Sequence, residues 1–337
     1  MSKEPFVIIN PNANSGRLGK NLEKILNITR SYVGDFEYIL TEKPRHEVDL
    51  ALKAISEGYR TIVALGGDGT ATNIGDVVVN HPDVTLGLLS AGSMCDIHRT
   101  HSIPYDLESS LEIFAEGHVG NFPAIKCTGD YSYYALDMAD GGFTAKAAAA
   151  SQSEMKWMKV GVIKYNYLAV KYVLKFKNLA GTITIDDKEP IRIEDLTNAF
   201  AAVGDVIAGY EVLPGNPYFS QKNKDLGIVI AHGMRGLRRL KMLLKASSGN
   251  HVGMRGIWLS RGKKLVVETD EEPLCWTSEG EVFNETGLRA EMERIDDAIR
   301  IIVPKDREYT YDYEESLYYQ DFEESFKERK IKRIKQK

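Results

Sequence analysis

Gly66-Gly67-Asp68-Gly69-Thr70 is the stretch of sequence that decides the fold. It follows Thr61-Ile62-Val63-Ala64-Leu65, an apolar and largely β-branched run that is typical of a buried strand, and a helix is expected over residues 71–80. A strand that ends in glycines at a helix start offers free backbone N–H groups to an anion, with no Cβ to block its approach. Asp68 and Thr70 add a carboxylate and a hydroxyl that Mg²⁺ and phosphate oxygens could share. We predict a phosphate site here; the alternative is a plain strand-to-helix turn.

Composition places the chain among soluble globular proteins, with 337 residues that are 43% hydrophobic and 27% charged. The length predicts two domains, since a single core rarely grows past about 250–300 residues. A formal net charge of −5 does not predict a nucleic-acid partner. Three cysteines without CxxC spacing argue against a disulfide framework or a zinc site. With neither a signal peptide's apolar region nor a membrane-spanning run, we expect a cytoplasmic protein that visits membranes transiently if its substrate is membranous.

Three further loops follow predicted strands in the first third of the chain. The polar loop 10–16 follows a strand over residues 6–9, Thr41 follows a strand over 36–40, and residues 90–93 follow a strand over 84–89. Strands that alternate with helices, one of them expected over residues 18–33, imply right-handed crossovers and a mostly parallel sheet. Ligands of such sheets bind beyond the carboxyl ends of the strands, where all of these loops lie. We therefore predict an α/β domain over residues 1–125 with a nucleotide-type site at that edge.

The rest of the chain has a different texture. Shorter strand-like runs separated by Gly, Asn and Pro predict a β-rich second domain over residues 126–304. Its last strand, over residues 298–303, either closes that domain or returns to the first. Residues 305–337 form a charged tail, aromatic and acidic at first and basic at its end, which we expect to be a surface helix or partly disordered.

A series of motifs between residues 6 and 304 resembles the diacylglycerol kinase catalytic family, which includes bacterial lipid kinases and sphingosine kinases and is distantly related to NAD kinases. The glycine-aspartate motif is specific for this superfamily, and the later matches count as a series. The motifs are Asn10-Pro11 with Ser15-Gly16, Thr41, Gly66 to Thr70, Gly92-Ser93 with Asp96, Gly142-Phe143-Thr144-Ala145, Lys159-Val160-Gly161 with Tyr165, and Glu279-Gly280-Glu281.

The resemblance implies transfer of the γ-phosphoryl group of ATP to a hydroxyl of a membrane lipid such as diacylglycerol. It places the nucleotide in a cleft between the α/β domain and the β-rich domain, with Asp68 helping to hold Mg²⁺. Such transfer needs mainly positioning and charge neutralisation. The residues that would line the nucleotide are Asn10, Asn12, Ser15, Gly16, Thr41, Gly66, Gly67, Asp68, Gly69, Thr70, Gly92 and Ser93.

The resemblance also points to a catalytic base in the second domain. The family uses the Asp of an Asp-Gly-Glu turn, and the turn here reads Glu279-Gly280-Glu281. Glu279 can accept a proton, but its longer side chain overshoots by about 1 Å unless the turn retreats, and such misplacement can cost about 10²-fold in rate. Glu281 could serve as a metal ligand or as the base. The alternative is a hairpin with two solvated glutamates.

Three departures from the family pattern put full activity in question. The loop Gly-Thr-Gly-Asn-Asp reads Gly92-Ser93-Met94-Cys95-Asp96, which loses one close backbone approach; Cys95 is either a small buried filler or a reactive thiol. The structural Mg²⁺ site of many bacterial members is expected to be absent, because the segment reads Lys222-Asn223-Lys224-Asp225, and a lysine ammonium is hypothesised in the cation's place. In the Gly-Phe-Asp-Ala pattern Thr144 replaces the acid, for which Asp137 or Asp140 could compensate unless both lie in surface turns.

Two basic segments without any acid, residues 155–179 and 233–264, suggest a route to the lipid. Each basic residue near an anionic bilayer can contribute about 1 kcal/mol, and Trp and Tyr suit the interface. We expect the pair to dock on an anionic membrane; amphipathic helices packed on a sheet are the alternative. An exposed strand edge in the second domain would permit a homodimer.

Two other functions stay open at this point. One is a kinase for a soluble substrate such as NAD, which shares the Gly-Gly-Asp-Gly motif. The other is a nucleotide-binding regulator that has lost transfer activity. This hypothesis is supported by Met94, Cys95 and the altered turn at Glu279.

Overall fold

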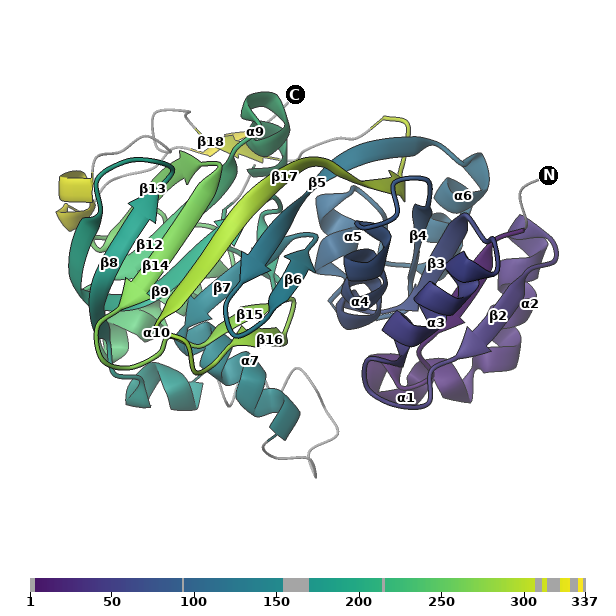
Figure 1. The fold of residues 1–337 in the computed structure, drawn as a ribbon, viewed down its shortest axis with the longest axis horizontal. Coiled ribbons are helices and arrows are strands. Elements are labelled where there is room, and N and C mark those ends of the chain that lie inside the picture. Colours follow the sequence, from purple (N-terminus) through teal and green to yellow (C-terminus); the bar gives the residue numbers. More distant parts are fainter. Residues whose placement is uncertain are drawn as a thin grey trace. The chain divides into compact units, whose positions relative to one another are not determined.

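The computed structural model describes residues 4–92, 94–153, 170–213, 216–306, 311–313, 322–327 and 333–335. Its contacts divide the chain into two compact units (Figure 1). Unit 1 comprises Met1–Ala124 and Ile295–Glu308, and unit 2 comprises Ile125–Arg294 and Tyr309–Lys337.

Unit 1 is an α/β domain with a parallel sheet, as predicted. Its strands run in the order β2-β1-β3-β4, and residues 300–301 near the end of β17 (Arg289–Ile302) pair with β4, also in parallel. The elements are β1 (Phe6–Ile9), α1 (Ala13–Lys20), α2 (Leu22–Val33), β2 (Glu37–Leu40), α3 (His46–Ser56), β3 (Thr61–Gly66), α4 (Asp68–Val78), β4 (Thr85–Ser90), α5 (Asp96–Thr100) and α6 (Leu107–Glu116).

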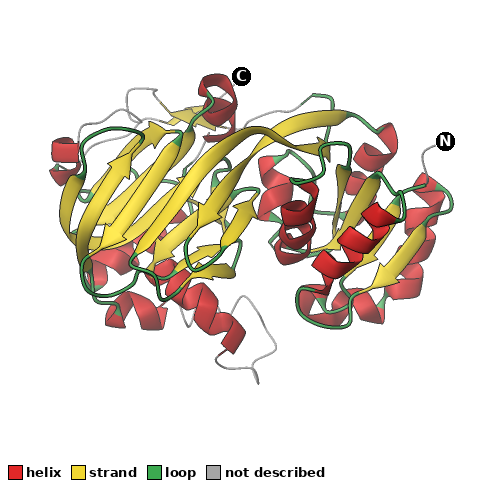
Figure 2. Cartoon of the chain, viewed as in Figure 1, coloured by secondary structure: helices red, strands yellow, loops and turns green. Residues whose placement is uncertain are grey.

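Burial on both faces explains why these short strands are apolar throughout. Val7 and Ile9 of β1 pack in a cluster with Leu26 of α2 and Leu111 of α6. Ile8, which points to the opposite face, is fully buried as well. Parallel sheets need cover on both sides, and helices flank both sides of this one (Figure 2).

Unit 2 is β-rich, as predicted, and its strands pair antiparallel. Residues 198–202 of β9 are bonded to β7, and residues 196–202 to β12, so this strand lies at the centre of the unit's sheet. The elements are β5 (Val119–Thr128), which starts in unit 1, β6 (Ser132–Ala135), β7 (Met138–Gly142), α7 (Phe143–Ser153), β8 (Leu179–Ile185), β9 (Ile191–Ala202), β10 (Val206–Ile207), β11 (Tyr210–Glu211), α9 (Asn216–Asn223), β12 (Leu226–His232), α10 (Leu237–Ala246), β13 (Ile257–Gly262), β14 (Lys264–Thr269), β15 (Trp276–Ser278), β16 (Glu281–Asn284), β18 (Tyr311–Tyr313), η2 (Phe322–Phe326) and β19 (Arg333–Lys335). Residues 170–175 are also helical.

Some boundaries differ from the predicted ones. The single helix expected over residues 18–33 is two helices, because the chain turns at Asn21, and α1 takes in the second half of the predicted loop 10–16. The run predicted as a strand over 298–303 is the end of β17, a 14-residue strand that starts in unit 2 and ends in unit 1. Within the described ranges, no helix is both long and apolar enough to cross a membrane.

Part of the C-terminal tail packs on unit 2. Phe322 of η2 lies 5.2 Å from the Trp258 ring and 5.0 Å from the His232 ring, measured between centroids. His232 Nε2 bonds Ser325 Oγ at 2.8 Å, and burial lowers the pKa of His232 to about 4, which keeps the ring neutral at pH 7. The backbone N–H of Gly256 donates to the carbonyl of Ser325 at 2.6 Å. This segment is therefore part of the packing of unit 2.

We expect Phe322→Ala to destabilise unit 2 by about 2 kcal/mol, because it removes a partly buried aromatic side chain and leaves a gap. Urea unfolding followed by tryptophan fluorescence reports on this unit, since all three tryptophans lie within residues 125–294. Phe326→Ala is the matched control, because that ring is 44% exposed and its loss should matter less. An unchanged urea midpoint for Phe322→Ala would show that the tail packs without stabilising unit 2.

Candidate active site

Asn10 joins the first loop of unit 1 to the glycine-aspartate turn. Its backbone N–H donates to the carbonyl of Leu65 at 3.1 Å, and its Nδ2 donates to Thr70 Oγ1 at 3.2 Å. Its Oδ1 in turn accepts from the backbone N–H of Asn12 at 3.0 Å. Buried Glu47 of α3, which sequence reasoning missed, accepts from Nδ2 at 3.4 Å and helps to orient this amide.

Glycines let the loops after β3 and β4 touch through their backbones. A Cβ at Gly92 would lie 2.4 Å from Cα of Gly67, and a Cβ at Gly66 would lie 2.5 Å from Thr70 Oγ1. A Cβ at Gly69 would instead meet nothing within 4 Å. Since the first N–H groups of α4 have no acceptor inside the helix, Gly69 leaves space for an anion at that helix start.

The first turn of α1 presents a second set of backbone N–H groups. Asn14, Ser15 and Gly16 are consecutive left-handed residues, with φ of 51°, 57° and 77°. Consecutive N–H groups in turn conformations of this kind form concavities that bind anions, and non-glycine residues rarely adopt them without a functional or packing reason. The N–H of Gly16 already donates to the carbonyl of Asn12 at 3.0 Å, so Ser15 is the residue of this turn suited to contribute a backbone donor.

The structure brings most of the predicted nucleotide residues to one edge of the parallel sheet. Thr41 is buried there, and its N–H donates to the carbonyl of Ile9 at 2.9 Å. The N–H of Ala91 donates to the carbonyl of Gly66 at 3.0 Å. This bond joins the loop at Gly92 to the glycine-aspartate turn, residues 66–70, which we call the phosphate cradle. Ser93 lies outside the described residues.

Asp68 is partly buried at the start of α4, and its Oδ1 accepts from the backbone N–H of Ile97 at 3.0 Å. Burial raises the pKa of Asp68 to about 7, and the charge of Asp96 adds to this shift. Asp96 is buried at the start of α5; the sequence marks it only as a motif position. A divalent cation would relieve the repulsion between these two acids.

The donor set at Asp68 fits Mg²⁺. This ion commonly takes one or two protein carboxylates and completes its shell with phosphate oxygens and water. Within the part of the chain that the structure describes, no group of three or more His, Cys, Asp or Glu residues could hold a metal by itself. Asp68, with Asp96 beside it, would therefore hold the ion together with a nucleotide.

Cys95 packs as a small buried side chain. Its backbone is left-handed, with φ of 54°, and burial followed by the charge of Asp68 raises the pKa of its thiol to about 12. A thiol that stays protonated at neutral pH is a poor nucleophile. Of the two interpretations of Cys95, the structure favours the buried filler.

In unit 2 the turn at Glu279 is drawn back onto β7. Glu279 and Gly280 have φ of 45° and 91°. Glu279 Oε1 accepts from the N–H groups of Asp137 at 2.8 Å and Met138 at 3.2 Å, and Oε2 bonds the hydroxyl of Ser278. Both oxygens of the Glu279 carboxylate are therefore hydrogen-bonded within unit 2. Glu281 is half-buried at the start of β16 and pairs with Ser278.

A buried hydrogen-bond network lies next to this turn. Thr277 Oγ1 donates to Asp140 Oδ1 at 2.6 Å, Thr144 also bonds Asp140, and Asn198 Nδ2 bonds Thr144 Oγ1. Asp137 and Asp140 are both 1% exposed, so the suggestion that they lie in surface turns is wrong. Asp140 is hydrogen-bonded to Thr144, the residue that stands where the Gly-Phe-Asp-Ala pattern has its acid.

A narrow, largely enclosed apolar cavity lies within unit 2. It is bounded by β9, β12, α10 and the β10–β11 hairpin, and Thr144 of the buried network is one of its few polar residues. Sequence reasoning missed this cavity, because residues distant in sequence form it. They are Thr144, Phe200, Ile207, Tyr210, Val212, Val229, Ala231, Met242, Leu243, Ala246, His251 and Ile257.

Three positive charges act on the carboxyl of Asp225, those of Arg261, Arg294 and Lys263, so the hypothesis of a lysine in the cation's place stays a prediction, with Lys263 as the lysine nearest to fitting it. Lys224 is exposed, whereas Arg261 and Arg294 are buried, and Arg294 Nη1 donates to the carbonyl of Asp225 at 3.2 Å. Burial raises the pKa of Asp225, and the two guanidinium groups act in the opposite direction.

Comparison with known proteins identifies the family. Residues 4–127 match the diacylglycerol kinase catalytic domain, and residues 138–303 match the YegS C-terminal NAD kinase beta sandwich-like domain. The chain therefore belongs to the diacylglycerol kinase catalytic-domain family, a family of kinases.

Individual relatives are distant but cover most of the chain. A protein named diacylglycerol kinase from Staphylococcus carnosus is 22% identical over 308 residues, which cover 91% of this chain and 97% of the relative. Another of that name from Staphylococcus saprophyticus is 23% identical, covering 80% of this chain and 86% of the relative. A solved structure of a diacylglycerol kinase from Bacillus anthracis has a TM-score of 0.63 at 16% identity, and the match covers 90% of this chain and 97% of that one. This structural likeness supports the fold.

Asp140 should make the stability of unit 2 depend on pH. Burial raises its pKa to about 6 in the folded protein, above the unfolded value of about 3.9, so its ionisation opposes folding as the pH rises through this window. We expect the stability of Asp140→Asn relative to wild type to increase by roughly 3 kcal/mol between pH 4 and pH 8. Urea unfolding followed by tryptophan fluorescence at several pH values measures this difference. A difference that is independent of pH would contradict a titrating Asp140.

Proposed function

We propose that this protein is an ATP-dependent lipid kinase that transfers the γ-phosphoryl group to a hydroxyl of a membrane lipid such as diacylglycerol. The observation that carries the proposal is the combination, in one chain, of a backbone phosphate cradle and an enclosed apolar cavity. A phosphate cradle alone would suit many nucleotide-binding proteins. The cavity has a volume of about 30 Å³, so its walls would have to move apart to admit a hydrocarbon body, which its apolar lining suits.

In this proposal unit 1 binds the nucleotide. The helix start at Asp68 and the left-handed turn at Ser15 would donate backbone N–H groups to the phosphates. Mg²⁺, held by Asp68, would neutralise charge on the transferred group. Asn10 would keep the first loop in register with Thr70, as it does in the structure through its amide.

Unit 2 would bind the lipid and supply the base. Thr144 lines the apolar cavity and is bonded to Asp140, which accepts from Thr277, two residues before Glu279. This network links the polar end of the cavity to the turn that carries the candidate base. The N–H groups of Asp137 and Met138 fix the carboxylate of Glu279, a positioned acceptor for the proton of a substrate hydroxyl. Glu281 is the alternative base or a metal ligand.

Labelled ATP incubated with the protein and a lipid extract tests the activity. We expect a labelled, organic-soluble product, and its loss by about 10²-fold or more in Asp68→Asn, because the phosphate charge would no longer be balanced. Asp49→Asn is the control, since this exposed acid on α3 pairs with surface Lys43. A labelled water-soluble product would instead indicate a soluble substrate, and nucleotide binding without turnover a regulator.

Narrowing the cavity should affect the lipid and not the nucleotide. Ala246 lines the cavity from α10, so Ala246→Phe would fill its space. We expect KM for diacylglycerol to rise about tenfold, the equivalent of 1.4 kcal/mol, with KM for ATP unchanged. Ala246→Ser is the size-matched control. Equal changes in both KM values would point to a general loss of structure.

A further inference from the structure

The outer face of α10 carries exposed leucines. Leu237 is 79% exposed and Leu244 is 69% exposed, and exposed Lys241 lies between them at helical spacing. The opposite face, with Arg239 and Met242, is buried. Surface leucines are usually scattered singly, so two on one stripe of a short helix mark a contact surface.

The helical residues 170–175 pack against α10 and carry exposed apolar side chains of their own. Leu174 is 60% exposed, and Val170, one turn before it, is exposed as well. Buried Arg239 joins the two helices, because its Nη1 donates to the carbonyls of Val173 at 2.9 Å and Phe176 at 2.7 Å. The leucine surface therefore comprises α10 and residues 170–175, which the packing holds together.

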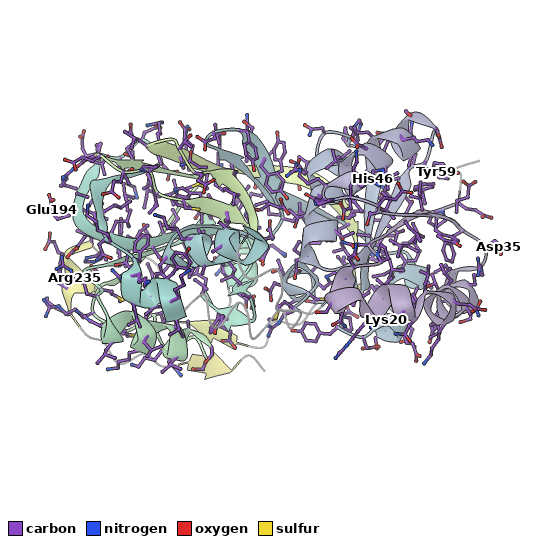
Figure 3. All side chains as sticks on the ribbon, turned by 90° about the horizontal axis from the view of Figure 1, so that it is seen from below. Lys20, Asp35, His46, Tyr59, Glu194 and Arg235 are labelled. Carbon is purple, nitrogen blue, oxygen red and sulfur yellow. The ribbon has the colours of Figure 1, made fainter. Side chains whose placement is uncertain are left out.

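The charges of the leucine surface are positive. Residues 235–245 contain five basic residues and no acid, and Lys171 and Lys175 flank Leu174. Arg235, labelled in Figure 3, is paired with Asp195 at 2.9 Å, whereas Lys241 is exposed beside the leucines. Leucines interspersed with lysines are typical of helices that lie in the interface of an anionic bilayer, where the lysine ammonium reaches the headgroups.

The apolar cavity gives a reason for a bilayer rather than a protein partner. Met242, Leu243 and Ala246 line it from α10, the same helix that exposes Leu237 and Leu244. One helix thus has leucines on its outer face and part of the wall of the narrow apolar cavity on its inner face.

We propose that α10 and residues 170–175 dock unit 2 on an anionic lipid bilayer. Leu237 and Leu244 enter the acyl boundary, and Lys241 and Lys245 lie at the phosphates of the headgroups. This proposal rests on the proposed lipid kinase function. Of the basic segment 233–264 that the sequence suggests for membrane docking, it uses only the first part. Arg239 takes no part in docking, because it is buried and bonded to backbone carbonyls. Residues 154–169 of the other segment lie outside the described residues.

Sedimentation with vesicles of 70% phosphatidylcholine and 30% phosphatidylglycerol, without nucleotide, tests the proposal. The wild type should bind, and Leu237→Ser with Leu244→Ser should weaken binding about tenfold or more. Lys241→Gln with Lys245→Gln should weaken it about thirtyfold at low salt, at about 1 kcal/mol per charge. Leu52→Ser is the matched control, since this leucine is 46% exposed on α3 of unit 1.

The controls separate docking from folding, catalysis and self-association. The leucine double variant should keep the wild-type urea midpoint and the wild-type activity on a short-chain diacylglycerol that is dissolved as monomers. Equal sedimentation of wild type and double variant would overturn the proposal. So would a wild-type dimer that the double variant converts to a monomer, because the surface would then join two copies. Vesicle binding without any kinase activity would refute the proposed function and leave the docking surface standing.

Discussion

The parallel pairing of β3 with β1 and β4 is the constraint on which the candidate site depends. Because the three strands run the same way, the loops at Asn10, Gly67 and Gly92 leave the sheet at one edge. The backbones of Gly67 and Gly92 then pack so closely that a Cβ on Gly92 would lie 2.4 Å from its neighbour. A Cβ at Gly69 would meet nothing within 4 Å, so the start of α4 faces open space, and the charge of Asp96 acts on the half-buried Asp68 beside it.

Unit 2 contains a different constraint, because polar side chains are buried in it beside apolar ones. Asp140 is fully buried, and bonds from Thr277 and Thr144 offset part of the cost of burying its carboxyl group. The same network lies beside the cavity and beneath the turn at Glu279. Thr144 belongs both to this hydrogen-bond network and to the wall of the apolar cavity.

Basic residues of one segment can have different physical roles, and Arg239 is the example. In the sequence it is one of several basic residues along an acid-free segment. In the structure its guanidinium is buried and satisfies carbonyls of Met234, Val173 and Phe176, so it joins α10 to the preceding helical residues. Its neighbours Lys241 and Leu244 face solvent. Helical periodicity shows which of these residues share a face of the helix. It does not show which face is buried, because that depends on the elements that pack against the helix.

The sequence by itself determined the α/β class of unit 1, the order of its strands along the chain and the cradle from Gly66 to Thr70, because strand-loop-helix patterns and glycine positions are local properties. It also indicated the β-rich character of unit 2. Only the tertiary structure decided that Asp96 lies beside Asp68, that Glu279 is drawn back onto β7, that Asp140 is buried and that Phe322 of the tail packs on Trp258. Each of these contacts joins residues far apart in sequence or sets the burial of a polar group, and neither is encoded in local spacing.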